Sequence, residues 1–207
     1  MKYKHIVFDI DGTLIDTEHA VLYSLQKTVK KLKNKDIEIS DLRFALGIPG
    51  KDALLQLGFT DLENAIDLWD HYMRDYFHTV GIFDGIKDIL DELKRKSYHL
   101  GIITSKSNLE YKNDFLPFGL AGYFDTVICA DDTVEHKPNP EPMQKYLEIA
   151  KVSNNEAIYI GDSVYDMQCA SKAGVDCALV LWGCNSATHI NATYYLNEPK
   201  DILNLVD

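Results

Sequence analysis

Two aspartates stand directly after a short apolar run near the amino terminus. The run at residues 5–8 leads into Asp9-Ile10-Asp11-Gly12. Side chains two positions apart on an extended segment point to the same side, so Asp9 and Asp11 should converge. Two ionised carboxylates this close repel each other unless a cation binds or the pKa of one of them rises. The pattern therefore indicates a cation site or an acid/base pair, although alone it also fits a polar turn.

A second pair of aspartates follows the apolar run at residues 157–160. Asp162 comes just after this run, and Asp166 lies one helical turn further along, on the same side of the expected helix. Asp162 could simply cap that helix, with Asp166 as an exposed acid. Together with Asp9, however, the two acids would form an all-oxygen cluster of the kind that binds Mg²⁺. We therefore predict a Mg²⁺ site.

Two other segments could bind an anion such as a phosphate group. Thr104 and Ser105 follow the apolar run at residues 100–103 and offer a hydroxyl beside free backbone N–H groups at a helix start. Lys137 precedes a proline-rich helix entry, in a loop after the run that ends at Ala130. A single lysine is usually a solvated surface charge. This loop, however, should lie at the same edge of the sheet as the aspartates.

Short apolar runs alternate with longer amphipathic ones, which is typical of a parallel sheet covered by helices on both faces. We predict an α/β fold with a Rossmann-like, doubly wound parallel sheet, which binds ligands at the carboxyl ends of its strands. The expected strands are 6–8, 100–104, 126–130, 157–160 and 177–181. The expected helices between them are 86–96, 109–116, 141–151 and 164–173.

About 90 residues separate the first two expected strands, whereas a βαβ unit needs only about 30. An inserted, entirely helical cap domain at residues 16–80 explains this spacing, with residues 1–15 and 81–207 as the core domain. Its last helix should begin with a capping box formed by Thr60 and Glu63. The other helices expected in the insertion are 17–33, 40–46 and 51–57.

The composition is that of a globular protein, with 46% hydrophobic and 26% charged residues among 207. A formal net charge of -11 would repel DNA or RNA, so no nucleic-acid partner is expected. No apolar segment approaches the roughly 20 residues of a membrane helix, and the start of the sequence does not read as a signal peptide. The four cysteines include no C-x-x-C pair and fit buried thiols, so we expect a cytoplasmic protein.

These motifs, in this order, resemble the haloacid dehalogenase-like superfamily. The resemblance rests on Asp9-Ile10-Asp11-Gly12-Thr13-Leu14, Thr104, Lys137 and the segment from Gly161 to Asp166. It covers essentially the whole chain, including a helical cap just after the first motif. The size of the cap is similar to that of the phosphoglycolate phosphatase-like branch.

The resemblance implies a role for each motif residue. Asp9 would be the nucleophile and a metal ligand, while Asp11 would be the general acid and base, with its backbone carbonyl reaching the metal. The remaining roles it implies are phosphate binding by Thr104 and Lys137, Mg²⁺ binding by Asp162, and a metal contact, direct or through a neighbour, by Asp166. The expected activity is Mg²⁺-dependent hydrolysis of a small phosphorylated metabolite through an aspartyl-phosphate, by a monomer or homodimer.

Other functions stay open at this point. Pyrophosphatase and β-phosphoglucomutase-like relatives share the motifs, although the mutase branch carries a histidine where this chain has Val21, and His19 lies on another helical face. A non-catalytic phosphometabolite-binding protein is a further alternative, as is a phospho-acceptor signalling domain, which would lack a cap. Arg43 and Lys51 flank the turn at residues 46–50 and could contact a second anionic group of the substrate, or could be solvated charges.

Overall fold

Six parallel strands form the central sheet of the computed structural model, which describes residues 2–184 and 187–206. The residues of the expected core domain that lie outside the described residues are 1, 185, 186 and 207. The α/β prediction with a Rossmann-like parallel sheet is confirmed. In spatial order the strands are β5 (Thr126–Ile128), β4 (His99–Ile103), β1 (His5–Phe8), β6 (Ala157–Gly161), β7 (Asp176–Val180) and β8 (Tyr194–Leu196).

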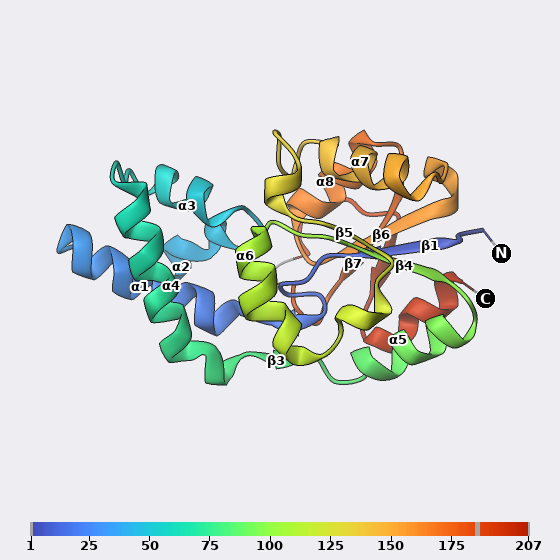
Figure 1. Ribbon diagram of the computed structural model, residues 1–207, viewed down its shortest axis with the longest axis horizontal. Helices are drawn as coiled ribbons and strands as arrows, with labels where there is room; N and C mark the ends of the chain where they lie inside the picture. The colour runs from blue at the N-terminus through green and yellow to red at the C-terminus, as the bar shows by residue number, and fades with distance from the viewer. Residues whose placement is uncertain (1, 185–186, 207) are drawn as a thin grey trace.

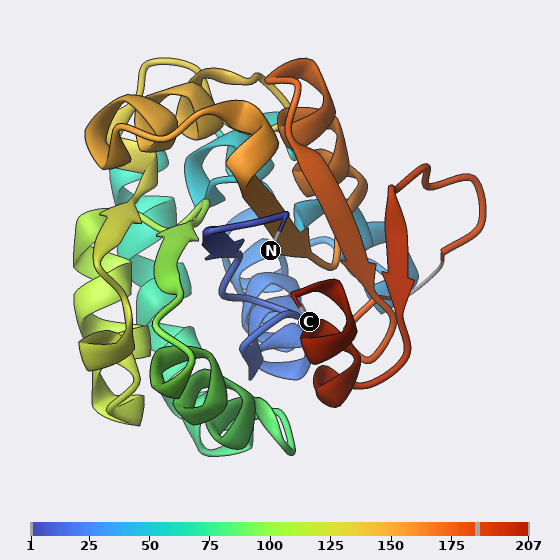
Figure 2. The ribbon, with the colours of Figure 1, turned by 90° about the vertical axis from the view of Figure 1, so that its right-hand side faces the viewer.

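Helical segments cover both faces of the sheet (Figure 1). Strand β1 contributes side chains to the apolar core on each face. Its side chains alternate, so Ile6 and Phe8 enter one apolar core while Val7 enters the other. The first core includes α5 (Ile86–Arg95) and the carboxyl-terminal 3₁₀ segment Pro199–Leu205. The second includes α7 (Glu141–Ala150) and α8 (Val164–Lys172), on the opposite side of the sheet (Figures 1 and 2). A strand buried on both faces explains the continuous apolar runs in the sequence.

The segment between β4 and β5 is less regular than the helix predicted at residues 109–116. It comprises α6 (Asn108–Glu110), a π-helical turn (Tyr111–Phe115) and a 3₁₀ turn (Leu116–Phe118). Pro117 has no N–H to donate to the preceding turn, so the α-helix cannot continue through it. The wider π turn changes which residues of this segment face the neighbouring parts of the chain.

The long insertion after β1 is helical, as expected. Two antiparallel strands, β2 (Ile15–Asp16) and β3 (Gly81–Ile82), lie where the chain enters and leaves it. We call the residues between these two strands the helical insertion. That residues 16–80 form a separate domain stays a prediction. Its helices are α1 (Glu18–Lys33), α2 (Ile39–Leu42), α3 (Gly50–Gln56) and α4 (Leu62–Tyr76), with 3₁₀ turns at Arg43–Ala45 and Phe77–Thr79.

The helical insertion has an apolar core of its own, which includes Leu25, Leu54 and Ala65. It lies beyond the carboxyl ends of the sheet strands (Figure 1). The predicted Thr60/Glu63 capping box is wrong. Helix α4 begins one residue later, where the side chain of Asp61 accepts a hydrogen bond of 3.4 Å from the backbone N–H of Asn64. Aspartate is among the strongest amino-terminal caps, so it takes this position.

Within the described residues, no helix is both long enough and apolar enough to cross a membrane.

Gly101 gives a test of how tightly β4 packs against α7. A Cβ atom at this position would lie 2.1 Å from Cε2 of the buried Tyr146. We expect Gly101→Ala to lower the free energy of unfolding by about 1–3 kcal/mol, because the core must shift to admit the methyl group. Denaturant unfolding of this variant and of Gly122→Ala, whose Cβ would have no atom within 4 Å, measures the effect. Equal stability of both variants would contradict the packing described.

Candidate active site

A buried lysine joins two loops and a helix at the carboxyl ends of the strands. Nζ of Lys137, between β5 and α7, lies 2.9 Å from Oδ1 of Asp9 and 2.7 Å from Oδ1 of Asp166. All three side chains are at most 3% exposed. The hydroxyl of Tyr159, on β6, lies 2.9 Å from the same oxygen of Asp166. Lys137 is therefore fixed from three directions, as its predicted place among the aspartates required.

Three carboxylates gather around this lysine. Asp9, Asp162 and Asp166 each offer an oxygen, and these oxygens lie within 4.8 Å of one another. Oδ1 of Asp162 is buried and has no hydrogen-bond partner among the described residues. Gly12 lets Asp162 come this close, since a Cβ there would lie 2.3 Å from Oδ2 of Asp162 and the φ angle of +73° suits glycine.

The charges of this cluster do not balance by themselves. When ionised, the three carboxylates and Lys137 carry a net charge of about -2 in a buried space, which one divalent cation would balance. Burial raises the pKa of Asp9 to about 7 against the opposing effect of Lys137. Burial, with the charges of Asp166 and Asp9, also raises the pKa of Asp162 well above its usual value. A hard oxygen set with an unpaired buried atom therefore fits Mg²⁺.

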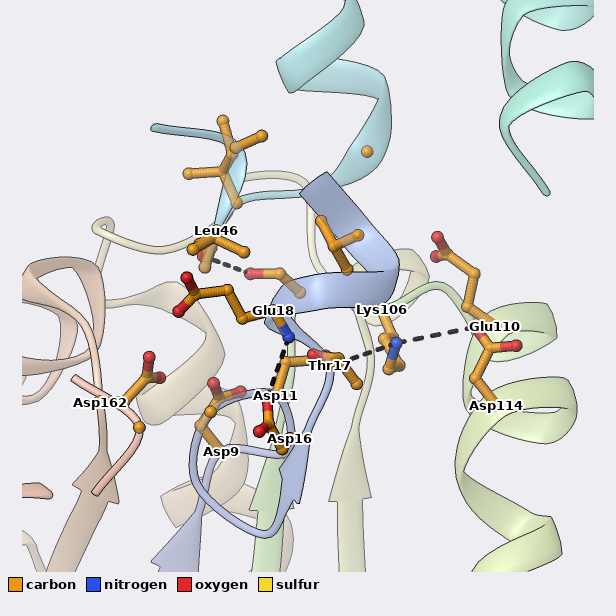
Figure 3. A pocket seen from close by; sticks show the side chains of 18 of the residues that line it. Asp9, Asp11, Asp16, Thr17, Glu18, Leu46, Lys106, Glu110, Asp114 and Asp162 are labelled. Carbon is orange, nitrogen blue, oxygen red and sulfur yellow. Dashed lines mark hydrogen bonds and ion pairs between the residues drawn. The ribbon is translucent and has the colours of Figure 1, made fainter. Parts of the chain in front are cut away.

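Asp11 has different partners from the three carboxylates of the cluster. Its Oδ1 accepts a hydrogen bond of 2.8 Å from Oγ1 of Thr17 and lies 3.1 Å from Nζ of Lys106. Lys106 also lies 3.6 Å from Oδ2 of Asp114, so its ammonium group stands between two carboxylates (Figure 3). Burial lowers the pKa of Lys106, but the negative charges of Asp11 and Asp114 raise it by more than burial lowers it. The net pKa of Lys106 is therefore above its usual value, and the side chain stays charged. The carboxylate of Asp11 is thus held by Thr17 and Lys106 rather than by Lys137.

Lys106 was not singled out from the sequence, although it stands beside two residues that were. The position of Lys106 in the loop directly after β4 is the signal that could have found it, because ligands bind at the carboxyl ends of parallel strands. Thr104 is buried, and its hydroxyl accepts a hydrogen bond of 3.2 Å from the backbone N–H of Lys106. Ser105 instead donates a 2.9 Å hydrogen bond to the carbonyl of Gly47 in the helical insertion.

A cavity of about 210 Å³ lies between these residues and the helical insertion. Figure 3 shows Asp9, Asp11 and Asp162 near one another on its floor, and Glu110 and Asp114 at one side. Its carboxylate lining comprises Asp9, Asp11, Asp16, Glu18, Asp70, Glu110, Asp114 and Asp162. Its apolar lining includes Val21, Ala45, Leu46, Ile48, Trp69, Met73, Phe83 and Trp182, and Ser105 and Lys106 complete the polar side.

The structure does not bring Arg43 and Lys51 into the lining of this cavity. Both side chains are exposed, and a guanidinium nitrogen of Arg43 lies 2.8 Å from Oε1 of Glu18. Arg43 therefore neutralises a lining carboxylate from outside. Lys51 stands in the first turn of α3, beside Gly50, which does line the cavity. The expectation that these two side chains contact a second anionic group finds no support in this arrangement.

Comparisons with known proteins agree with the geometry. A family model described as haloacid dehalogenase-like hydrolase matches residues 6–180. A phosphoglycolate phosphatase from Aquifex aeolicus is 30% identical over 205 residues, which cover 98% of this chain and 96% of that protein. The pyrophosphatase PpaX from Oceanobacillus iheyensis is 28% identical over 210 residues, with coverage of 100% and 98%. A crystal structure from Lactobacillus plantarum superposes with a TM-score of 0.89, at 28% identity and coverage of 99% and 100%.

Metal binding should stabilise the protein more at high pH than at low pH. The folded-state pKa of Asp9, about 7, exceeds that of an unfolded aspartate, near 4. Asp9 therefore stabilises the metal-free fold below about pH 4, and this contribution is lost as the pH rises through 7. Because Mg²⁺ binds the ionised form, the Mg²⁺-induced rise in Tm should be larger at about pH 8 than at about pH 5.5.

Differential scanning calorimetry with and without Mg²⁺ measures this difference. Asp162→Asn serves as the comparison, since it removes one charge from the cluster and should reduce the Mg²⁺-induced rise at both pH values. A rise of equal size at the two pH values, or one unaffected in Asp162→Asn, would be inconsistent with a metal held by these carboxylates.

Proposed function

The chain belongs to the haloacid dehalogenase-like hydrolase family, and we propose that it is a Mg²⁺-dependent phosphatase that uses Asp9 as its nucleophile. The observation that carries the proposal is the position of Asp9 on the cavity floor, 2.9 Å from the buried ammonium of Lys137 and within a three-carboxylate cluster. Few other arrangements explain why so much charge is buried beside a substrate-sized space.

Asp9, Asp162 and Asp166 would hold the metal ion, together with the backbone carbonyl of Asp11 that the family resemblance implies. Bound there, Mg²⁺ supplies positive charge to the oxygens of the transferring phosphoryl group. Lys137 adds a fixed positive charge on the protein side of Asp9, where its position costs no rearrangement during the reaction. In this proposal, the positive charges that would stabilise the phosphoryl oxygens are in place before the substrate binds.

The roles that the family resemblance implies for Asp9 and Asp11 give two steps of hydrolysis. An oxygen of Asp9 attacks phosphorus, the bond from phosphorus to the leaving oxygen breaks, and Asp11 gives that oxygen a proton. Asp11 then takes a proton from a water molecule that attacks the aspartyl-phosphate. The bond between phosphorus and Asp9 breaks in this second step, which releases phosphate and restores both carboxyl groups.

The cavity volume and the relatives together support a substrate class. A space of about 210 Å³ suits a phosphate group with a few additional atoms. We infer that the substrate is a small phosphomonoester, and the full-length similarity to PpaX makes pyrophosphate a second candidate. A mutase activity is less favoured, because Val21 lines the cavity while the ring of His19 stacks on Tyr23 at 4.2 Å. An intact set of Asp9, Asp11 and Lys137 disfavours a non-catalytic binding protein.

Hydrolysis of p-nitrophenyl phosphate by the purified protein tests the proposal. We expect Mg²⁺-dependent release of p-nitrophenol that falls to background in Asp9→Asn, because the amide cannot form the covalent intermediate. Asp67→Asn, an exposed carboxylate outside the cavity lining, is the matched control and should keep full activity. Normal turnover by Asp9→Asn, or no turnover of any phosphate ester by the wild-type protein, would refute the function.

Lys106 should act as a positioning residue for Asp11. Without its ammonium group Asp11 keeps only the hydrogen bond from Thr17, so Lys106→Met should lower kcat for p-nitrophenyl phosphate by about tenfold or more and change KM little. Lys106→Arg should recover part of kcat, whereas Lys112→Met, at an exposed lysine outside the lining, should have no effect. A higher KM with normal kcat in Lys106→Met would instead assign Lys106 to substrate binding.

A further inference from the structure

The side of the cavity that is formed by α4, α6 and the π-helical turn, which we call the acidic wall, carries an excess of negative charge. Asp70 on α4, Glu110 at the end of α6 and Asp114 in the π-helical turn all line it. Lys106 is the single positively charged side chain among the described lining residues, and it is already shared between Asp11 and Asp114. This wall therefore has no cation left to receive a second anionic group.

Asp70 is the member of this wall that belongs to the helical insertion and has no ion pair with Lys106. Burial raises the pKa of Asp70 to about 6, and the negative charges of Glu110 and Asp114 add to the effect. Arg74, one helical turn along α4, opposes the shift, but it is exposed and outside the lining. Around neutral pH Asp70 is thus an ionised carboxylate that faces a partly desolvated space.

The residues around Asp70 favour a substrate group that is positively charged over one that is a neutral hydrogen-bond donor. Trp69, its neighbour on α4, also lines the cavity, and its indole N–H is used in a 2.8 Å hydrogen bond to Oγ of Ser24. The indole N–H is thus turned to another partner and cannot stabilise a substrate anion. Glu110 uses Oε2 to accept from the N–H and hydroxyl of Ser107, at 2.6 and 2.7 Å. A protonated amine between Asp70 and Glu110 would reduce their mutual repulsion.

On the basis of the function proposed above, we propose that the preferred substrate is a small phosphomonoester whose alcohol carries a protonated amine, and that Asp70 is the residue that selects it. A carboxylate or phosphate in the leaving group would meet like charges from Asp70 and Glu110, at a cost that low-dielectric surroundings increase. The chain would then differ in specificity from relatives named for phosphoglycolate and pyrophosphate hydrolysis.

Three two-carbon phosphates of nearly equal size test this charge preference. They are O-phosphoethanolamine, 2-hydroxyethyl phosphate and 2-phosphoglycolate, whose leaving groups are cationic, neutral and anionic. With Mg²⁺ at about pH 8, where Asp70 is ionised, kcat/KM should decrease in that order. We expect a difference of about tenfold or more between the first and the last, as a charge-assisted hydrogen bond provides.

The variant Asp70→Asn separates charge from shape, because it keeps the size of the side chain. It should lower kcat/KM for O-phosphoethanolamine by about tenfold, leave 2-hydroxyethyl phosphate nearly unchanged and raise the value for 2-phosphoglycolate. Glu63→Gln, at an exposed residue two turns back on the same helix and outside the cavity lining, should leave all three values unchanged.

Two outcomes would overturn the inference while leaving the phosphatase function in place. One is 2-phosphoglycolate as the best of the three substrates, and the other is an equal effect of Asp70→Asn on all three. Hydrolysis of p-nitrophenyl phosphate but of none of the three compounds would also overturn it. Failure to hydrolyse any ester, p-nitrophenyl phosphate included, would instead refute the proposed function together with the inference.

Discussion

The ion pairs of Lys137 with Asp9 and Asp166 are the interaction on which the rest of the site depends. Removing these charges from water costs several kcal/mol for each ion, and only close, well-oriented partners compensate for that cost. The three residues come from three separate segments, so the sheet and α8 must place both carboxylates within 3 Å of Nζ of Lys137. The apolar cores on both sheet faces keep these segments in position. Asp162 has no such partner among the described residues, so its charge is the one that the proposed metal ion would balance.

The second constraint is the contact between the helical insertion and the sheet. Ser105 donates to the carbonyl of Gly47, and Nδ1 of His136 lies 3.4 Å from Oδ2 of Asp52. These two contacts hold the insertion over the carboxyl ends of the strands and leave a small cavity rather than an open surface. The floor of this cavity carries the carboxylates of Asp9, Asp11 and Asp162, whereas α1, α4 and the turn at residues 46–50 form its walls. On the proposals above, the floor would carry out the reaction and the charge on the walls would select the substrate.

Much of this architecture follows from the sequence, because buried parallel strands leave unmistakable apolar runs. The sequence also predicted that Asp9, Asp162 and Lys137 lie close together, because parallel strands place their carboxyl ends at one edge of the sheet. The strands β2 and β3 were not predicted, because two residues show no period, and the three-residue strand β8 was not predicted either. Two features of the site depend on the position of the insertion relative to the sheet, which no local sequence pattern predicts. These features are the ion pairs of Lys106 and the exposure of Arg43 and Lys51. The start of α4 was misplaced by one residue, since Thr60 and Asp61 are both good helix caps.

The short ladder between β2 and β3 has a consequence for the order of events in turnover. Ile15 pairs with Ile82 and Asp16 with Gly81, so both connections to the insertion run side by side. Thr17, the next residue, donates to Asp11. A swing of the insertion about this ladder would move Thr17 and release Asp11 from one of its two partners. On the proposed mechanism, proton transfer by Asp11 would then occur only while the insertion covers the cavity, and this would protect the aspartyl-phosphate from attack by bulk water.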